Sequence, residues 1–130
     1  MNSYNHYEIN LDDKTIGFRL TASACMEIET KENKSVIDFI NTETVSMCVT
    51  MLQHMRSYED KSFDKGKAKV LFDELIDNGW SIKRIITDII YETLVVSGFL
   101  EKEELEEIKK TTAEMKAKMK TKAIEVLNNI

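Results

Sequence analysis

The sequence YEINLDDKTIGFRL, residues 7–20, decides how this chain begins to fold. Apolar and polar residues alternate on both sides of a short polar segment, and a period of two is typical of strands with one buried face. The apolar positions are Tyr7, Ile9, Leu11, Ile16, Phe18 and Leu20. Asp12, Asp13 and Lys14 form the predicted turn. Residues 7–20 are therefore predicted to form a β-hairpin, whose apolar face must pack on other elements because an isolated ribbon is marginal in water.

From Thr21 onward the apolar residues follow a helical spacing, and the chain contains no proline to interrupt it. Thr21 or Ser23 is predicted to cap a first helix that ends near Lys31, before Asn33 and Lys34 break it. Polar residues suited to helix caps also precede the later apolar segments. These segments are a short turn that starts at Ser35 and a helix over about 42–57 capped by Asn41 or Thr42. Two more helices follow, one over 64–78 capped by Asp64 and one over 82–97 capped by Ser81.

The helix over 82–97 is the most apolar of these, and its apolar residues cover more than one face. They are Ile82, Ile85, Ile86, Ile89, Ile90, Leu94 and Val95. Such coverage predicts the central helix of the core. The other two long helices have narrower apolar stripes. Their expected core residues are Val45, Cys48, Met51, Leu52 and Met55 in one, and Leu75 and Ile76 with either Val70 and Leu71 or Phe72 in the other.

A different kind of segment follows Gly98, Phe99 and Leu100. In residues 101–130 glutamates crowd the first turns and lysines follow, an order that suits the dipole of a helix. An apolar seam with 3-4-3-4 spacing, close to that of a coiled coil, consists of Leu105, Ile108, Thr112, Met115 and Met119. The predicted fold is α+β, with an N-terminal β-hairpin packed on a mainly helical bundle in a domain of residues 1–100. A long charged amphipathic helix of residues 101–130 forms the tail.

Composition narrows the classes of function. The chain has 130 residues, a formal net charge of −5 and 42% hydrophobic residues. An acidic chain is a poor ligand for duplex phosphates, which require clustered Lys and Arg, so no nucleic-acid partner is expected. No apolar run approaches the ~18–20 residues of a membrane span. The N-terminus lacks the pattern of an export signal, so a cytoplasmic location without membrane contact is predicted.

Cysteine and histidine are too sparse for most catalytic or metal chemistry. Cys25 and Cys48 are the two cysteines, they form no C-x-x-C motif, and only His6 and His54 could assist them. Both cysteines lie among apolar neighbours and are predicted to be buried reduced thiols. Neither a nucleophile motif nor a glycine-rich phosphate loop is present. We therefore expect no enzyme, no catalytic residue, no metal and no cofactor.

Two sets of residues are candidates for binding a partner. Met47, Met51 and Met55 recur at i, i+4 and i+8, and methionine side chains adapt to varied partners. The alternative is that they fill the core. The second set is the tail seam, with Leu105, Ile108, Met115 and Met119 as its apolar members. That seam could contact a client, a second subunit or the chain's own core domain.

The amino-acid sequences of several segments resemble those of the tail assembly chaperones of siphophages and their prophages. INLDDKT at 9–15 is similar to the opening strand and turn of that family, and ACMEIE at 24–29 with KSVIDF at 34–39 is similar to the helix and turn that follow. LIDNG at 75–79 and SGF at 97–99 also look similar. The resemblance covers about residues 7–100. Two departures are Asp13, where the family favours glycine, and a longer charged tail.

The resemblance implies a non-enzymatic assembly factor. Members of that family are thought to coat the long tape measure protein while the tail tube polymerises around it. The expected partner is therefore a tape measure protein, together with further copies of this chain in a homo-oligomer. The expected location is the cytoplasm of the bacterial host, and the protein is expected to be absent from the mature virion.

Two other functions remain open. Residues 71–90 have the spacing of a helix-turn-helix, in which a DNA-binding regulator would present Ser81, Lys83, Arg84 and Thr87. Its single basic pair is followed by acidic residues, so a packing corner explains the same spacing. A generic helical adaptor, unrelated to phage, fits the sequence as well.

Overall fold

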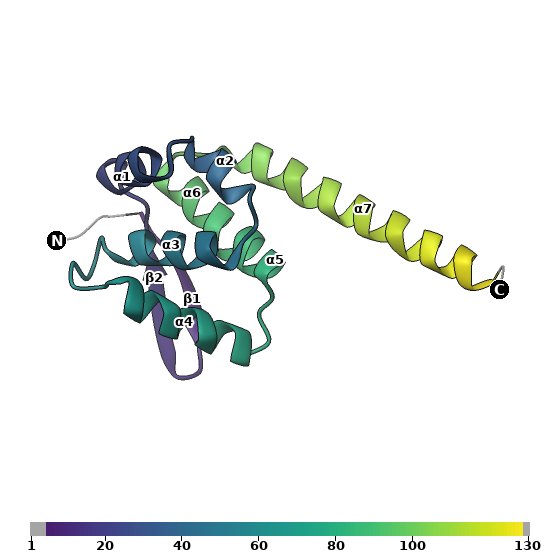
Figure 1. Cartoon of the computed structure of the whole chain (residues 1–130), viewed down its shortest axis with the longest axis horizontal. Coiled ribbons are helices and arrows are strands. Elements are labelled where there is room, and N and C mark those ends of the chain that lie inside the picture. Colours follow the sequence, from purple (N-terminus) through teal and green to yellow (C-terminus); the bar gives the residue numbers. More distant parts are fainter. Residues whose placement is uncertain (1–4, 129–130) are drawn as a thin grey trace. The chain divides into compact units, whose positions relative to one another are not determined.

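The computed structural model describes residues 5–128, except for the side chains of 116 and 119–128. The chain divides into two units, Met1–Leu100 and Glu101–Ile130. The first unit consists of a two-stranded antiparallel hairpin followed by helices, and the second is one long helix (Figure 1). The predicted α+β architecture, a hairpin on a mainly helical bundle, is confirmed.

The hairpin consists of β1 (Tyr7–Leu11) and β2 (Lys14–Phe18). Tyr7 is paired with Phe18 and Leu11 with Lys14, which leaves a two-residue turn. Asp12, the first residue of that turn, has a φ of 55°. Aspartate tolerates this left-handed conformation better than most residues with a side chain, which explains how the turn forms without glycine.

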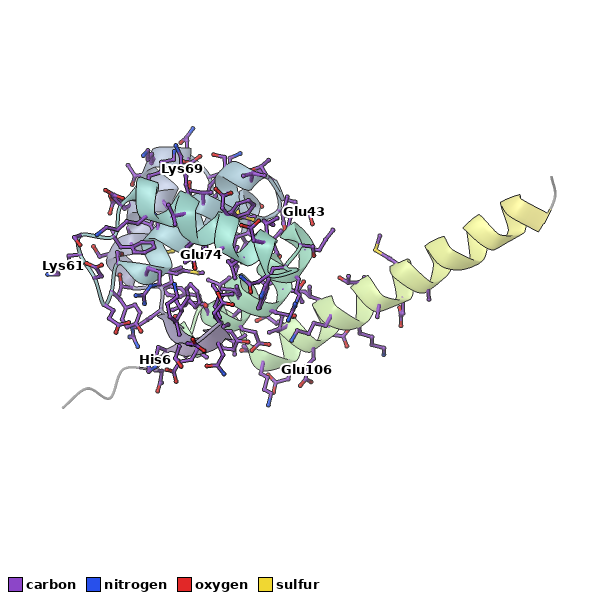
Figure 2. All side chains as sticks on the ribbon, turned by 90° about the horizontal axis from the view of Figure 1, so that it is seen from below. His6, Glu43, Lys61, Lys69, Glu74 and Glu106 are labelled. Atoms are coloured by element: carbon purple, nitrogen blue, oxygen red, sulfur yellow. The ribbon has the colours of Figure 1, made fainter. Side chains whose placement is uncertain are left out.

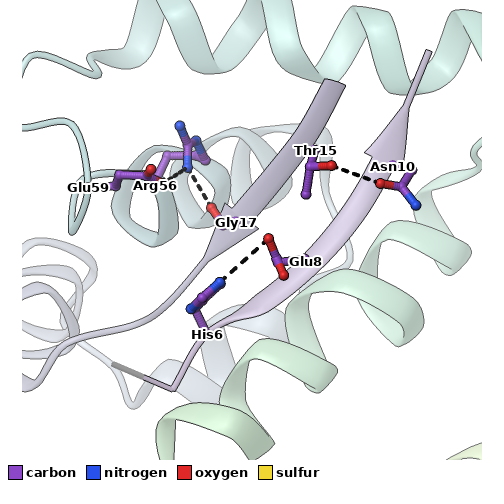
Figure 3. Close-up of polar contacts among 7 residues, drawn as sticks. All are labelled: His6, Glu8, Asn10, Thr15, Gly17, Arg56 and Glu59. Atoms are coloured by element: carbon purple, nitrogen blue, oxygen red, sulfur yellow. Dashed lines mark hydrogen bonds and ion pairs between the residues drawn. The ribbon is translucent and has the colours of Figure 1, made fainter. Parts of the chain in front are cut away.

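Backbone groups at the end of β2 attach the hairpin to the helices. The amide of Arg19 donates to the carbonyl of Met55 at 2.9 Å, and the amide of Leu20 donates to Ser97 Oγ at 2.9 Å. Arg56 Nη1 donates to the carbonyl of Gly17 at 2.6 Å and contacts Glu59 Oε2 at 2.9 Å (Figure 3). The apolar face of the hairpin is therefore held against the bundle, and it buries Ile9, Leu11, Phe18 and Leu20.

The first two helices begin where the sequence predicts. α1 (Ala22–Glu32) is capped by Thr21, whose Oγ1 accepts from the amide of Ala24 at 3.1 Å. It ends at Asn33 in the left-handed conformation. α2 (Val36–Ile40) is a short helix capped by the Ser35 hydroxyl. Their buried residues are Ala24, Cys25, Ile28, Val36, Phe39 and Ile40.

The most enclosed helix is α3 (Val45–Arg56), and every residue from Met47 to Leu52 is buried. It contacts β2, α1, α2 and α4 as well as the helical segment that follows α4. The expectation that 82–97 is the central helix is therefore corrected. Thr50 and His54 weaken the apolar pattern of α3, yet both are buried, and the His54 ring bonds the Thr50 carbonyl through Nδ1 at 2.9 Å.

The start of α3 also differs from the prediction. Thr44 is the cap, with its hydroxyl accepting from the amide of Met47 at 3.1 Å, so the helix begins later than Asn41 or Thr42 would place it. Glu43, before the cap, has a φ of 51°. Val45 then lies in the first turn with 48% of its surface exposed, and not in the core.

α4 (Lys65–Asp77) lies beside α3 and is capped by Asp64, as predicted (Figure 1). Its buried residues are Ala68, Leu71, Phe72 and Leu75. Val70 and Ile76 are 59% and 40% exposed, so their expected place in the core is corrected. Both lie at the edges of the buried stripe of α4, which has Leu71 and Leu75 near its middle.

Residues 82–97 form a continuous helical segment whose middle is π-helical. It consists of α5 (Ile82–Ile85), the π turn η1 (Ile86–Ile90) and α6 (Tyr91–Ser97), with the predicted cap at Ser81. Thr93 is wholly buried and satisfies its hydroxyl by donating to the carbonyl of Ile89 at 2.6 Å. The extra residue per turn alters which residues face the core, and Ile82 and Val95 are only half-buried.

The second unit is α7 (Lys102–Asn128), the long charged helix expected from the tail sequence. The amide of Leu105 donates to the carbonyl of Glu101 at 3.1 Å, which closes its first turn. In the part of the chain that the structure describes, no helix is both long and apolar enough to cross a membrane.

Candidate partner-binding surface

The three methionines of α3 lie in the core. Met47, Met51 and Met55 each have 0% of their surface exposed. Their i, i+4, i+8 spacing places them on one face of α3, and that face is covered by the elements packed against it. The structure thus assigns them to packing, the alternative considered from the sequence, and leaves a partner no access to them.

The tail residues differ from one another in exposure. Leu105 is 3% exposed, Ile108 is half-buried and Met115 is 59% exposed. The side chain of Met119 lies outside the described residues. Ile108 and Met115 are seven residues apart and so lie on the same side of α7. Of the predicted seam, these two offer described apolar surface to a partner.

A groove of about 470 Å³ lies between α3 and α4. We call it the α3–α4 groove, and it is lined by Val45, Ser46, Val49, Lys65, Lys69, Phe72 and Asp73. Val49 and Phe72 are buried and form its apolar floor, whereas Val45 is half exposed at its edge. The lysines and Asp73 are exposed at its rim. An apolar floor with a charged rim suits a helix that inserts one or two side chains.

Helical spacing explains why these residues meet. Lys65, Lys69, Phe72 and Ile76 are separated by four, three and four residues, which places them on one stripe of α4. The sequence alone does not reveal the groove, because its apolar spacing places Val45 in the core. The sequence does contain one indication of the groove. Lys65 and Lys69 lie on the same helical stripe as Phe72, and a stripe that faces the core rarely carries two lysines.

The charges of α4 are ordered along the helix. Lys65, Lys67 and Lys69 occupy its first half, and Asp73 and Asp77 its second. This order opposes the helix dipole, which favours anions at the N-terminus and cations at the C-terminus. Lys61 and Lys69 both project outward from the first unit (Figure 2). The groove therefore has a basic end and an acidic end.

The core contains two free thiols, Cys25 and Cys48, which could in principle act as nucleophiles. Burial raises the pKa of the Cys48 thiol from 9.0 to about 11. Burial and the nearby Glu29 carboxylate also raise the pKa of Cys25. Both thiols are therefore protonated at neutral pH and poor nucleophiles, since the thiolate is the reactive form. Among the described residues, no group of three or more His, Cys, Asp and Glu is placed to hold a metal ion.

The corner between α4 and α5 carries the basic pair that a DNA-binding regulator would use. Lys83 contacts Glu43 at 2.6 Å, and Arg84 contacts Asp88 at 3.6 Å. Arg84 also lies over the Trp80 ring, 3.9 Å from its centre. Because each cation faces a carboxylate, the positive potential that attracts phosphates is reduced at this corner.

Comparison with known proteins returns no match to any family model, curated protein or solved structure. Inference about function therefore depends on the α3–α4 groove, on the exposed face of α7 and on the resemblance of residues 7–100.

Proposed function

We propose that this protein is a tail assembly chaperone of a siphophage or prophage, which binds and coats the tape measure protein during tail assembly. The resemblance of residues 7–100 suggests the family. The observation in the structure that carries the proposal is the α3–α4 groove, an open apolar surface edged by charges on a small helical unit.

The chemistry of the groove suits the proposed client. A tape measure protein is a long, largely helical chain with apolar stripes, and these stripes need cover until the tail tube encloses them. A groove with two apolar residues in its floor can hold only a short piece of such a stripe. Each contact is therefore expected to be weak, micromolar or poorer, and coating would depend on many copies along one client.

Weak contacts also suit the removal of the chaperone. The growing tube must displace each copy, and low affinity for a single site permits rapid release. In this proposal the protein acts in the cytoplasm of the host bacterium without nucleotide, metal or nucleic acid, and is absent from the finished particle.

Co-expression with a tape measure protein of the same phage or prophage tests the proposal. The client should be soluble with this chain and should aggregate without it. Val45→Asp should reduce the rescue because it places a charge at the edge of the groove, and Met115→Asp should do the same on α7. Met26→Asp is the matched control, since Met26 is 66% exposed on α1, away from the groove.

A client that is fully soluble alone and does not co-purify with this chain would contradict the proposal. A generic helical adaptor would then be the better description. Equal rescue by Val45→Asp and Met26→Asp would show that client binding, if present, uses another surface.

A further inference from the structure

The charge order of α4 requires an explanation. Lys65 and Lys67 lie in its first turn and Asp77 in its last turn, where the helix dipole opposes each sign of charge. Among the described side chains, Lys65, Lys69 and Asp77 form no ion pair. This order of charges does not stabilise α4 by itself. A partner helix with the opposite order of charges would stabilise it through ion pairs.

The chain itself contains such a helix. α7 begins with exposed glutamates, which include Glu103, Glu104 and Glu107, and continues with basic residues such as Lys110 and Lys118. Figure 2 shows Glu106 in the acidic part of α7, and Lys69 at the basic end of α4. If the two helices were parallel, glutamates would face lysines at one end and lysines would face aspartates at the other. Antiparallel helices would place like charges together at both ends.

The stripe of α4 that lines the groove and a stripe of α7 also have the same spacing. On α4 the stripe is Lys65, Lys69, Phe72 and Ile76, and on α7 it is Glu104, Ile108, Thr111 and Met115. Each stripe begins with a charged residue and ends with an apolar one, and both step by four, three and four residues. A parallel alignment that places Glu104 beside Lys65 therefore also places Met115 beside Ile76.

We propose that the α3–α4 groove of one copy binds α7 of a second copy, with α7 and α4 parallel. The inference does not rest on the proposed chaperone function, because it uses only the residues of this chain; the client and α7 of a second copy would compete for the same groove. The groove and α7 are different surfaces, so the contact is heterologous, and each added copy presents a further groove. Association should therefore increase with concentration and weaken with salt.

Charge reversal in the full-length chain provides the test. Sedimentation velocity from about 1 μM to about 1 mM should show association of the natural chain. Lys65→Glu with Lys69→Glu (the groove variant) should weaken association about tenfold or more, because it places like charges together. Glu104→Lys with Glu107→Lys (the helix variant) should do the same. Lys31→Glu with Lys34→Glu is the matched control, with the same change in net charge at exposed positions outside the groove.

Mixing makes the test specific. The groove variant and the helix variant, each weakened alone, should associate with each other, because each mutated surface then meets its complement. A monomer at all concentrations would overturn the proposal. So would equal effects of the groove variant and the matched control, or a mixture no more associated than its components.

The parallel orientation has its own test. Oxidation of a mixture of Ile76→Cys and Met115→Cys chains should give more crosslinked heterodimer than a mixture of Lys65→Cys and Met115→Cys chains. The reverse preference would contradict parallel docking. Far-UV circular dichroism of each variant, compared with the natural chain, verifies that the helices are retained.

Discussion

At the scale of single residues, side chains that cap or bridge backbone groups determine where the elements meet. Arg56, at the end of α3, is the clearest case. Its guanidinium joins the carbonyl of Gly17 in β2 to the carboxylate of Glu59, and that carboxylate consequently has a lowered pKa, mainly through the hydrogen bond from Arg56. Gly17 itself leaves little room, because a Cβ there would lie 2.6 Å from the Tyr58 hydroxyl.

Replacing Arg56 should therefore loosen the hairpin. Arg56→Met removes a charged donor from a partly buried carbonyl, and we expect the free energy of unfolding to fall by about 1.5–3 kcal/mol. The urea midpoint measures this change. Lys14→Met is the control, since Lys14 contacts Glu74 in an exposed ion pair at 3.1 Å whose loss should cost less than about 1 kcal/mol. Equal losses for the two variants would contradict the anchoring role of Arg56.

At the scale of elements, cap residues were predictable because they act over three or four positions of sequence. Thr21, Ser35, Asp64 and Ser81 each cap the helix that the sequence assigned to them. The start of α3 was not predictable in this way, because Thr42 and Thr44 are equally suited to capping and the left-handed Glu43 selects the second. The burial of α3 also depends on elements that are distant in sequence. The periodicity of the apolar residues in α3 gives no information about them.

A substitution in α3 tests its central position. Met51 has no exposed surface, so Met51→Ala should leave a cavity and lower the free energy of unfolding by about 2–5 kcal/mol. Chemical denaturation of the purified chain measures the loss. Met26→Ala is the control, because Met26 is largely exposed on α1 and its truncation should cost within about 0.5 kcal/mol. A Met51→Ala chain as stable as the Met26→Ala chain would contradict the view that α3 is the centre of the core.

At the scale of the whole molecule, the sequence predicted a hairpin, a helical bundle and a charged helix, but not the surface available to a partner. The predicted methionines Met47, Met51 and Met55 share a face that other elements cover. The α3–α4 groove forms where Val45 of α3 and Phe72 of α4 come together. Helical periodicity predicts which residues share a face of a helix, but not how much of that face a neighbouring helix covers. Surfaces formed between elements therefore had to come from the structure.

The central claim is that many copies coat one long client. The most direct measurement is the native mass of complexes purified with tape measure fragments of two different lengths. We predict several copies per fragment, with a number that rises in proportion to fragment length, because each copy covers one short stretch of helix. A single copy on both fragments, or no complex with either, would contradict the account.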